Sequence, residues 1–279
     1  MAPNMNRRFG GLARLYGELG AKKIRAAHVV VVGLGGVGSW TAEALARSGV
    51  AKLTLIDLDH IAESNINRQI HALESTLGQA KVQAMRERIF QINPECEVHC
   101  VEEFVDASNW PAIAALDLER NLDQSVSIID ACDQVRAKTA MAAWALQFNA
   151  KNKGQQKINF ISVGAAGGKR HAHKVEIDDL SLTTHDPLLA QMRYRLRKEQ
   201  GAARLGKIGV TCVFSRESVL QPMRAASPEN DLTLDDASTV DSVIKSDNSL
   251  GCQGYGSVVS VTATFGICAA GWAIEKITE

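Results

Sequence analysis

The sequence predicts an α/β fold: a Rossmann-like, mostly parallel sheet with flanking helices, followed by a C-terminal extension with added strands and an apolar helix. An apolar run at 28–32 enters a glycine-rich turn, strand and helix patterns then alternate, and a stretch without charge covers 257–274. Strands separated by helices require right-handed crossovers, which set parallel strands side by side. We expect one domain over 1–279, with an ATP-binding part at about 8–165 and a substrate-binding or dimerisation part at 166–279.

The individual elements follow from apolar runs and from helix start and stop signals. Asn93-Pro94 ends one predicted helix, and Asp186-Pro187 begins another. In chain order, the sequence predicts strands at 28–32, 51–57, 97–101, 126–130, 157–163 and 208–214, and helices at 39–48, 78–92, 135–148 and 187–200. Residues 222–250 are polar, rich in Asp and Ser and without periodicity, so we expect a mobile loop there.

The uncharged C-terminal run at 257–274 reaches the lower length limit for a membrane-spanning helix. Its Ser, Thr and Gly residues lower its hydropathy. We therefore expect a buried helix that packs closely through small residues, against the core or a second subunit, and no stable membrane insertion. Membrane association through this run is the alternative.

Composition favours a cytoplasmic enzyme. The 279 residues are 46% hydrophobic, enough for one large core or two small ones. The formal net charge is zero, so a nucleic-acid partner would have to meet a local positive patch. Six cysteines occur without a disulfide framework or a secretory signal and are expected to be reduced thiols.

A glycine-rich turn after the first strand predicts a nucleotide site. Glycines let the backbone approach phosphate, the following helix offers unpaired N–H groups, and an acid at the next strand end can bind a ribose. The glycines are Gly33, Gly35, Gly36 and Gly38, and the acids at the next strand end are Asp57 and Asp59. Alone, this pattern fits any nucleotide-binding α/β fold, most often a dehydrogenase.

A polar cluster after the second strand favours ATP instead. Its members are Asn65, Arg68, Gln69 and, on the next predicted helix, Lys81. A dehydrogenase has no use for this set beside one ribose-binding acid. Amides that donate hydrogen bonds and cations that neutralise shifting charge suit a triphosphate whose phosphorus–oxygen bond breaks.

The stretch Ser-Asn-x-Asn-Arg-Gln at 64–69 resembles the ATP site of the ubiquitin-activating-enzyme-like adenylating superfamily. The resemblance implies that the four glycines approach the phosphates and that Asp57 and Asp59 meet the ribose and the polar end of the site. It also implies that Asn65 and Gln69 bind the nucleotide, that Arg68 acts on the phosphates, and that Lys81 is the lysine of the following helix.

Two acids follow the predicted strand at 126–130. The resemblance matches Asp133 to the superfamily's magnesium ligand, although Gln134 stands where the superfamily has Asn. Magnesium takes one or two carboxylates together with water and phosphate oxygens. We expect Asp130 to cap the helix at 135–148 and keep it as a candidate for the nucleotide site at the same strand end.

The N-terminal stretch at 8–17 is similar to the opening segment of the superfamily, whose arginine reaches the ATP of the partner subunit. That resemblance implies a homodimer in which Arg14 acts in trans. A solvated arginine on a helix face is the alternative.

Sulfur-carrier-activating members commonly hold zinc through two CxxC pairs, and this sequence has no CxxC. Cys212 and Cys252 are candidate nucleophiles, Cys252 the better one, and a small buried hydrophobe is the alternative for both.

Several stretches resemble the tRNA threonylcarbamoyladenosine dehydratase family, a branch of this superfamily without the zinc pairs. The stretches lie at 8–17, 36–45, 66–73, 91–96, 206–215 and 261–266. The resemblance implies ATP-dependent activation of the threonyl carboxylate beside the anticodon and closure of a ring with loss of water. Adenylation of the C-terminus of a ubiquitin-like sulfur carrier is the runner-up. The implied partners are tRNA, a second copy of the chain and a sulfur-transfer protein.

A local excess of positive charge is the candidate tRNA contact. Its cations are Arg193, Arg195, Arg197, Lys198, Arg204 and Lys207, opposed by one acid and interleaved with a tyrosine that could stack on a base. An ordinary solvated helix face is the alternative. Lys169, Arg170 and Lys174 are a second candidate contact.

Overall fold

A seven-stranded sheet forms the centre of the computed structural model, which describes residues 4–116, 126–152, 157–221 and 255–279. Across the sheet the strands run β3 (Glu97–Val101), β2 (Lys52–Ile56), β1 (His28–Val32), β4 (Val126–Asp130), β5 (Ile158–Val163), β7 (Thr211–Ser215) and β6 (Val175–Asp179). Neighbouring strands are parallel except β6, which pairs antiparallel with β7 at the edge. The predicted α/β class with a mostly parallel sheet is confirmed.

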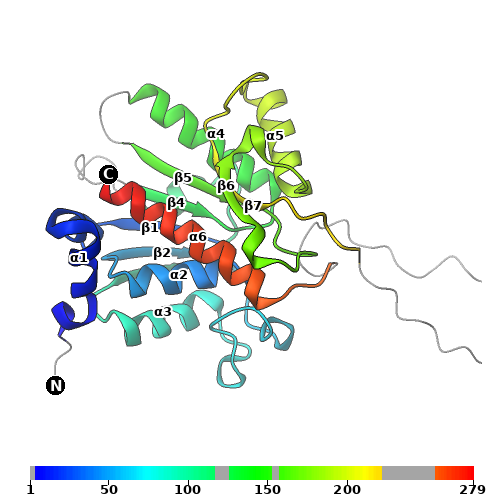
Figure 1. Ribbon diagram of the computed structural model, residues 1–279. Coiled ribbons are helices and arrows are strands. Elements are labelled where there is room, and N and C mark those ends of the chain that lie inside the picture. Colours follow the sequence, from blue (N-terminus) through cyan, green and yellow to red (C-terminus); the bar gives the residue numbers. More distant parts are fainter. Residues whose placement is uncertain (1–3, 117–125, 153–156, 222–254) are drawn as a thin grey trace, which may run out of the picture.

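Helices cover both faces of this sheet (Figure 1). Val29 and Val31 of β1 pack with α1 (Met5–Ile24), α2 (Gly38–Arg47), α3 (Lys81–Ile92) and α6 (Val259–Thr278). Val30 and Val32 face the opposite core, which includes α4 (Val135–Lys151) and α5 (Pro187–Glu199). Because successive side chains of a strand point to opposite faces, a strand buried on both sides becomes a continuous apolar run.

Sequence patterns missed one strand and placed another too early. Edge strand β6, Val-Glu-Ile-Asp-Asp, is short and half polar, so it lacks the apolar run of its buried neighbours. Strand β7 begins at Thr211 and not at Ile208. The N–H groups of Ile208 and Gly209 donate to the Asp179 carboxylate at 2.9 and 2.7 Å and thus lie outside the strand ladder.

The uncharged tail forms the buried helix that its composition predicts. Helix α6 crosses the sheet beside α2 and buries Val261, Phe265 and Ala269 in the core (Figure 1). In the parts of the chain that the structure describes, no helix is long and apolar enough to cross a membrane. The predicted loop at 222–250 lies outside the described residues.

Candidate active site

A cavity of about 390 Å³ lies at the carboxyl ends of the parallel strands. Its walls come from the segments that follow four neighbouring strands, represented by Gly33 after β1, Asp57 after β2, Asp133 after β4 and Gly164 after β5. In open α/β sheets, ligands bind where the strand order reverses outside these ends. Residues from 33 to 262 meet here because parallel strands bring their carboxyl ends to one edge.

Glycines shape the wall between β1 and α2. Gly33 has φ +85°, and a Cβ added there would lie 2.9 Å from the Cys132 nitrogen. At Gly38 an added Cβ would lie 1.7 Å from the Gly33 oxygen, so this glycine lets α2 begin against the turn. Gly35 and Gly36 line the cavity, whereas Gly38 does not line it and allows the start of α2 to pack against Gly33. Among the residues with described positions, no side chain caps the start of α2, which leaves first-turn N–H groups for an anion.

Two carboxylates and one lysine form the next wall. Asp57 accepts hydrogen bonds from the Leu34 nitrogen at 2.5 Å and the Asp59 nitrogen at 2.9 Å. Burial raises the pKa of Asp57, while Lys81 and these two N–H groups act in the opposite direction. The Lys81 ammonium lies 2.6 Å from the Asp59 carboxylate and 3.8 Å from that of Asp57. The lysine is therefore held at the cavity wall by two opposite charges.

The loop after β2 contributes Asn65, Arg68 and Gln69 to the cavity. The Trp40 indole N–H donates to the Arg68 carbonyl at 2.9 Å and fixes the backbone there. The Arg68 guanidinium donates to the Ser64 carbonyl at 2.5 Å. Within the described residues, the buried Arg68 Nε and Gln69 Oε1 have no hydrogen-bond partner. Buried polar atoms normally have partners, so these two suit a polar ligand in the cavity.

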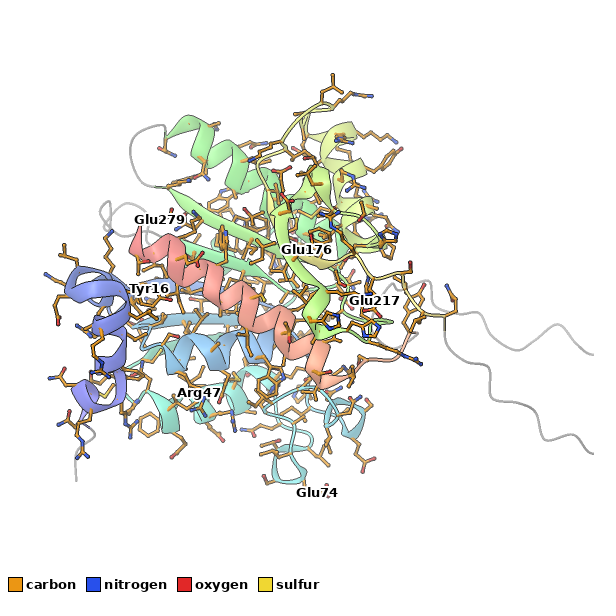
Figure 2. The ribbon with its side chains drawn as sticks, viewed as in Figure 1. Tyr16, Arg47, Glu74, Glu176, Glu217 and Glu279 are labelled. Atoms are coloured by element: carbon orange, nitrogen blue, oxygen red, sulfur yellow. The ribbon has the colours of Figure 1, made fainter. Side chains whose placement is uncertain are left out.

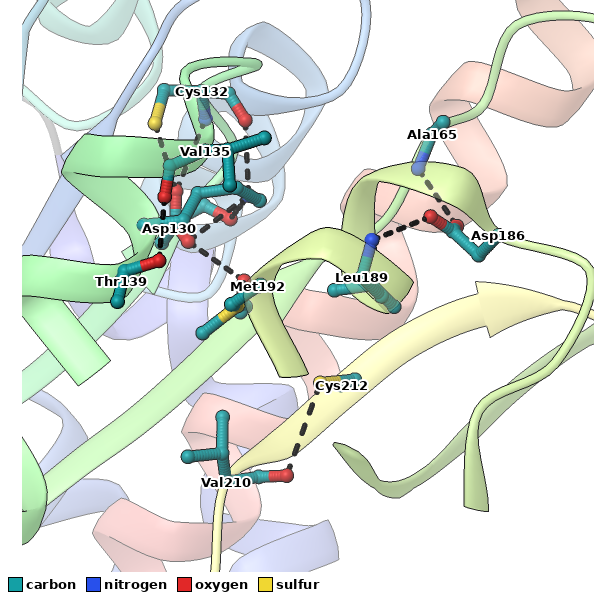
Figure 3. Close-up of polar contacts among 12 residues, drawn as sticks. Asp130, Cys132, Val135, Thr139, Ala165, Asp186, Leu189, Met192, Val210 and Cys212 are labelled. Atoms are coloured by element: carbon teal, nitrogen blue, oxygen red, sulfur yellow. Dashed lines mark hydrogen bonds and ion pairs between the residues drawn. The ribbon is translucent and has the colours of Figure 1, made fainter. Parts of the chain in front are cut away.

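Asp130 does not cap α4, and that prediction was wrong. The N-cap of α4 is Gln134, and Asp130 shares a face of β4 with Val126 and Ile128 beneath α4. Its carboxylate lies 2.9 Å from the Lys138 ammonium, both side chains being 0% exposed. The Cys132 thiol also donates to it (Figure 3). The Ser162 hydroxyl donates to the same carboxylate at 2.7 Å. The carboxylate consequently does not line the cavity.

Asp133, three residues beyond β4, has the opposite placement. It is exposed and lines the cavity together with Gln134. Lys138 fixes the backbone between Asp130 and Asp133, because its ammonium donates to the carbonyls of Asp130 at 3.3 Å and Cys132 at 2.9 Å. One acid of the pair is thus a buried anchor and the other an open carboxylate at the strand end.

A cavity with a glycine turn, an uncapped helix start, paired carboxylates and two cations has the parts of an adenylating site, and comparison with known proteins agrees. The ThiF family model matches residues 7–279. The chain belongs to the ThiF family.

Two curated relatives are named tRNA threonylcarbamoyladenosine dehydratase. The Escherichia coli K12 protein is 40% identical, over 97% of this chain and 93% of its own length. The Haemophilus influenzae protein is 37% identical, over 99% and 95%.

A solved structure resembles this ThiF-family chain over almost its whole length. It is that of E. coli tRNA N6-threonylcarbamoyladenosine dehydratase, TcdA, in complex with ATP. The TM-score is 0.78 at 39% identity, covering 98% of this chain and 94% of that one. The predicted membership of this superfamily is therefore confirmed.

Arg14 lies on α1, away from the cavity of its own chain. It is exposed and absent from the cavity lining. Helix α1 packs at the amino-terminal end of the sheet, where Gly20 meets Thr278. Figure 2 shows the neighbouring Tyr16 on α1 at one end of the molecule and Glu217, after β7, at the other. A role for Arg14 at the cavity would therefore require a second subunit.

The predicted basic surface on α5 is only partly available. Arg193 donates to the carbonyls of Leu180 at 3.0 Å and Thr183 at 2.9 Å, so it anchors the chain before α5. Arg195 pairs with Glu199 at 3.0 Å. One nitrogen of the Arg193 guanidinium is thus used inside the protein, and a tRNA contact by Arg193 stays a prediction. The other candidates, Arg197, Lys198, Arg204 and Lys207, are not at the cavity.

The two candidate thiols have separate outcomes. Cys212 lies in β7 and is 0% exposed, and burial raises the pKa of its thiol well above the usual value. A buried protonated thiol is a poor nucleophile, so the structure favours the small buried hydrophobe for Cys212 over the candidate nucleophile. Cys252 lies outside the described residues.

Part of the cavity wall was not among the predicted site residues. The stretch Gly164–Gly167 after β5, the start of α5 at Pro187 and Leu188, and Tyr255 all line it. A glycine-rich stretch directly after a buried strand was the available signal for 164–167. For Leu188 and Tyr255 no local pattern exists, since only the folded chain brings them to the cavity.

Proposed function

We propose that this protein uses ATP to dehydrate threonylcarbamoyladenosine next to the anticodon of tRNA. The near full-length match to curated dehydratases carries the proposal. The cavity adds a chemical reason, because Arg68 and Lys81 supply cations beside the open start of α2. No described feature favours the sulfur-carrier alternative.

The threonyl carboxylate is a poor electrophile, because its leaving group would be oxide. In the proposed reaction a carboxylate oxygen attacks the α-phosphate of ATP and the bond to pyrophosphate breaks. The neighbouring carbamoyl group then attacks the activated carbonyl carbon, loses a proton and releases AMP. The two steps together remove one water from the modified nucleoside. Attack within one side chain has a high effective concentration, so no enzyme thiol is required.

Each wall of the cavity has a proposed role. The glycine turn approaches the phosphates, and Asp57 and Asp59 meet the ribose and the polar end of the site. Asn65 and Gln69 bind the nucleotide through their amides. Arg68 and Lys81 stabilise the negative charge that moves onto pyrophosphate. Arg14 of a partner subunit completes the site in a homodimer.

Asp133 is the residue that would hold magnesium. Among the residues with described positions, no group of three or more His, Cys, Asp or Glu side chains could hold a metal by itself. An exposed single carboxylate fits magnesium, which keeps several waters and takes its other ligands from phosphate. When bound, the ion would supply positive charge that neutralises the phosphates. We also propose a cytoplasmic location, where tRNA is found, while a sulfur-transfer partner stays a prediction.

The deciding experiment incubates the protein with ATP, magnesium and tRNA that carries the modified adenosine. Mass spectrometry of the nucleoside should show the loss of one water. Arg68→Ala and Lys81→Ala should each lower the rate by about 100-fold or more, because each removes charge stabilisation in the transition state. Lys52→Ala is the matched control, since Lys52 pairs with Glu97 at the amino ends of β2 and β3.

Cys252→Ala should retain most of the activity. Loss of activity in this variant, together with adenylation of a carrier protein's C-terminus, would favour the sulfur-carrier reaction. Failure of the unsubstituted protein to change the nucleoside would contradict the proposed function.

A further inference from the structure

An exposed basic segment follows directly on the cavity wall at β5. It comprises Arg170, His171, His173 and Lys174, all exposed, and it begins three residues after Gly167, which lines the cavity. Three residues span at most about 11 Å of chain. We propose that this segment binds the phosphate backbone of the RNA beside the nucleotide that enters the cavity. The inference rests on the proposed function and names the surface that the RNA meets.

A buried lysine holds the base of this segment. Lys169 is 3% exposed and donates to the carbonyls of His185 at 2.8 Å, Ser215 at 3.2 Å and Glu217. These oxygens come from the turn before α5 and from the end of β7 and the chain after it. Because its ammonium is used inside the protein, Lys169 cannot contact tRNA, and that part of the second candidate contact was wrong. It joins three chain segments into one support.

Two carboxylates complete the support. Asp186 accepts from the Ala165 nitrogen and the Leu189 nitrogen, both at 2.9 Å, and so ties the cavity loop to α5 (Figure 3). Glu217, at the start of the chain after β7 (Figure 2), accepts from the backbone nitrogens of Arg170 and His171, both at 3.0 Å. The segment therefore starts from a fixed backbone, and ordering it on RNA costs little entropy.

The charge balance around the segment favours an anionic partner. Glu217 is 9% exposed, and its carboxylate is directed at backbone N–H groups and lies 3.9 Å from the His171 ring. Glu176 pairs with Arg216 at 2.8 Å. Among the described residues, the side chains of Arg170 and Lys174 form no ion pair. These two cations are thus available for phosphate.

The chemistry of the segment fits RNA in particular. Cations on phosphates supply most of the affinity for a nucleic acid, and unpaired loop bases stack on aromatic rings, histidine included. The rings of His171 and His173 lie 5.5 Å apart on this surface. The surface of α5 offers fewer available cations for phosphate, because Arg193 donates to a carbonyl of its own chain and Arg195 pairs with Glu199.

The test replaces Arg170→Gln and Lys174→Gln together and measures tRNA binding over a range of salt. Each lost phosphate contact should reduce the slope of log affinity against log salt by about 0.7 to 0.9. Raising salt from about 50 to 200 mM should then weaken the unsubstituted protein about 7 to 12 times more than the variant. The KM for tRNA should rise while kcat and the KM for ATP stay unchanged, as for an interaction made equally in the ground and transition states.

The matched control is Lys151→Gln with Lys157→Gln. Both are exposed lysines near the amino end of β5, opposite to the cavity, and the net charge changes by the same amount. The control should bind tRNA as the unsubstituted protein does. Equal salt slopes for the two double variants would overturn the inference, as would a rise in the KM for ATP or a loss of folding in the Arg170/Lys174 variant. Dehydration of the nucleoside by the unsubstituted protein is measured separately. A failure of the proposed function can therefore be distinguished from a failure of the proposed RNA contact.

Discussion

At the scale of single residues, the Asp130–Lys138 pair stands out because both charges are fully buried. Burial lowers the pKa of Lys138, but the Asp130 carboxylate, together with the nearby Cys132 and Cys212, outweighs this effect, and the pKa is raised. The ammonium therefore stays charged and bonds to two carbonyls of the turn that leads to Asp133. A buried pair is weak evidence for stability, and here its visible role is to fix the backbone of a site wall.

We expect Lys138→Met to destabilise the protein by about 3 to 5 kcal/mol, because it leaves the Asp130 carboxylate buried without its partner. Asp130→Leu combined with Lys138→Met should recover much of this loss, since no lone charge remains. Urea denaturation measures both. The control is Arg195→Gln in the exposed pair with Glu199, which should cost less than about 1 kcal/mol. A Lys138→Met cost no larger than the control's would refute this account.

At the scale of elements, α6 explains why an uncharged tail belongs to a nucleotide-binding fold. The helix lies against α2, and the Thr41 hydroxyl donates to the Gly266 carbonyl at 3.1 Å. Thr262 of the same helix lines the cavity. Small residues permit this close packing, which a bulkier helix would prevent. The tail is thus a part of the cavity wall as well as of the core.

Two glycines of α6 give a matched test of this packing. An added Cβ at Gly266 would lie 2.4 Å from the Val37 oxygen, whereas at Gly271 nothing lies within 4 Å. Gly266→Ala should destabilise by about 1 to 3 kcal/mol through overpacking and should raise the KM for ATP, because Val37 is the N-cap of α2 and lines the cavity. Gly271→Ala should stabilise by up to about 1 kcal/mol, since alanine favours helix. Thermal unfolding compares them, and equal effects would contradict the packing described.

At the scale of the whole molecule, the cavity lies at the carboxyl ends of the strands, whereas helix α1, which carries Arg14, lies at the opposite end of the sheet (Figure 1). Within one chain the arginine therefore has no path to the nucleotide. A two-fold dimer would give each cavity one arginine from its partner and would make each site depend on two chains.

Co-expression of two differently tagged inactive variants tests this arrangement. Arg14→Ala and Asp133→Asn should each be inactive alone. Their mixed dimer should recover about half of the normal activity, because one of its two sites receives an intact Asp133 and an intact Arg14. The tandem-purified dimer is assayed for nucleoside dehydration. A mixed dimer as inactive as its parents would contradict a role for Arg14 in trans.

The sequence by itself determined the α/β class, most strand and helix positions and several of the residues that line the cavity. It could do so because strand patterns are local, and because parallel strands bring their carboxyl ends to one edge, where Gly33, Asp57 and Asp133 follow. Only the tertiary structure decided the roles of Asp130, Lys169 and Arg193, which are internal anchors. Their partners lie on other segments, up to 48 residues away for Lys169, and no local pattern records whether a charged side chain meets such a partner or solvent.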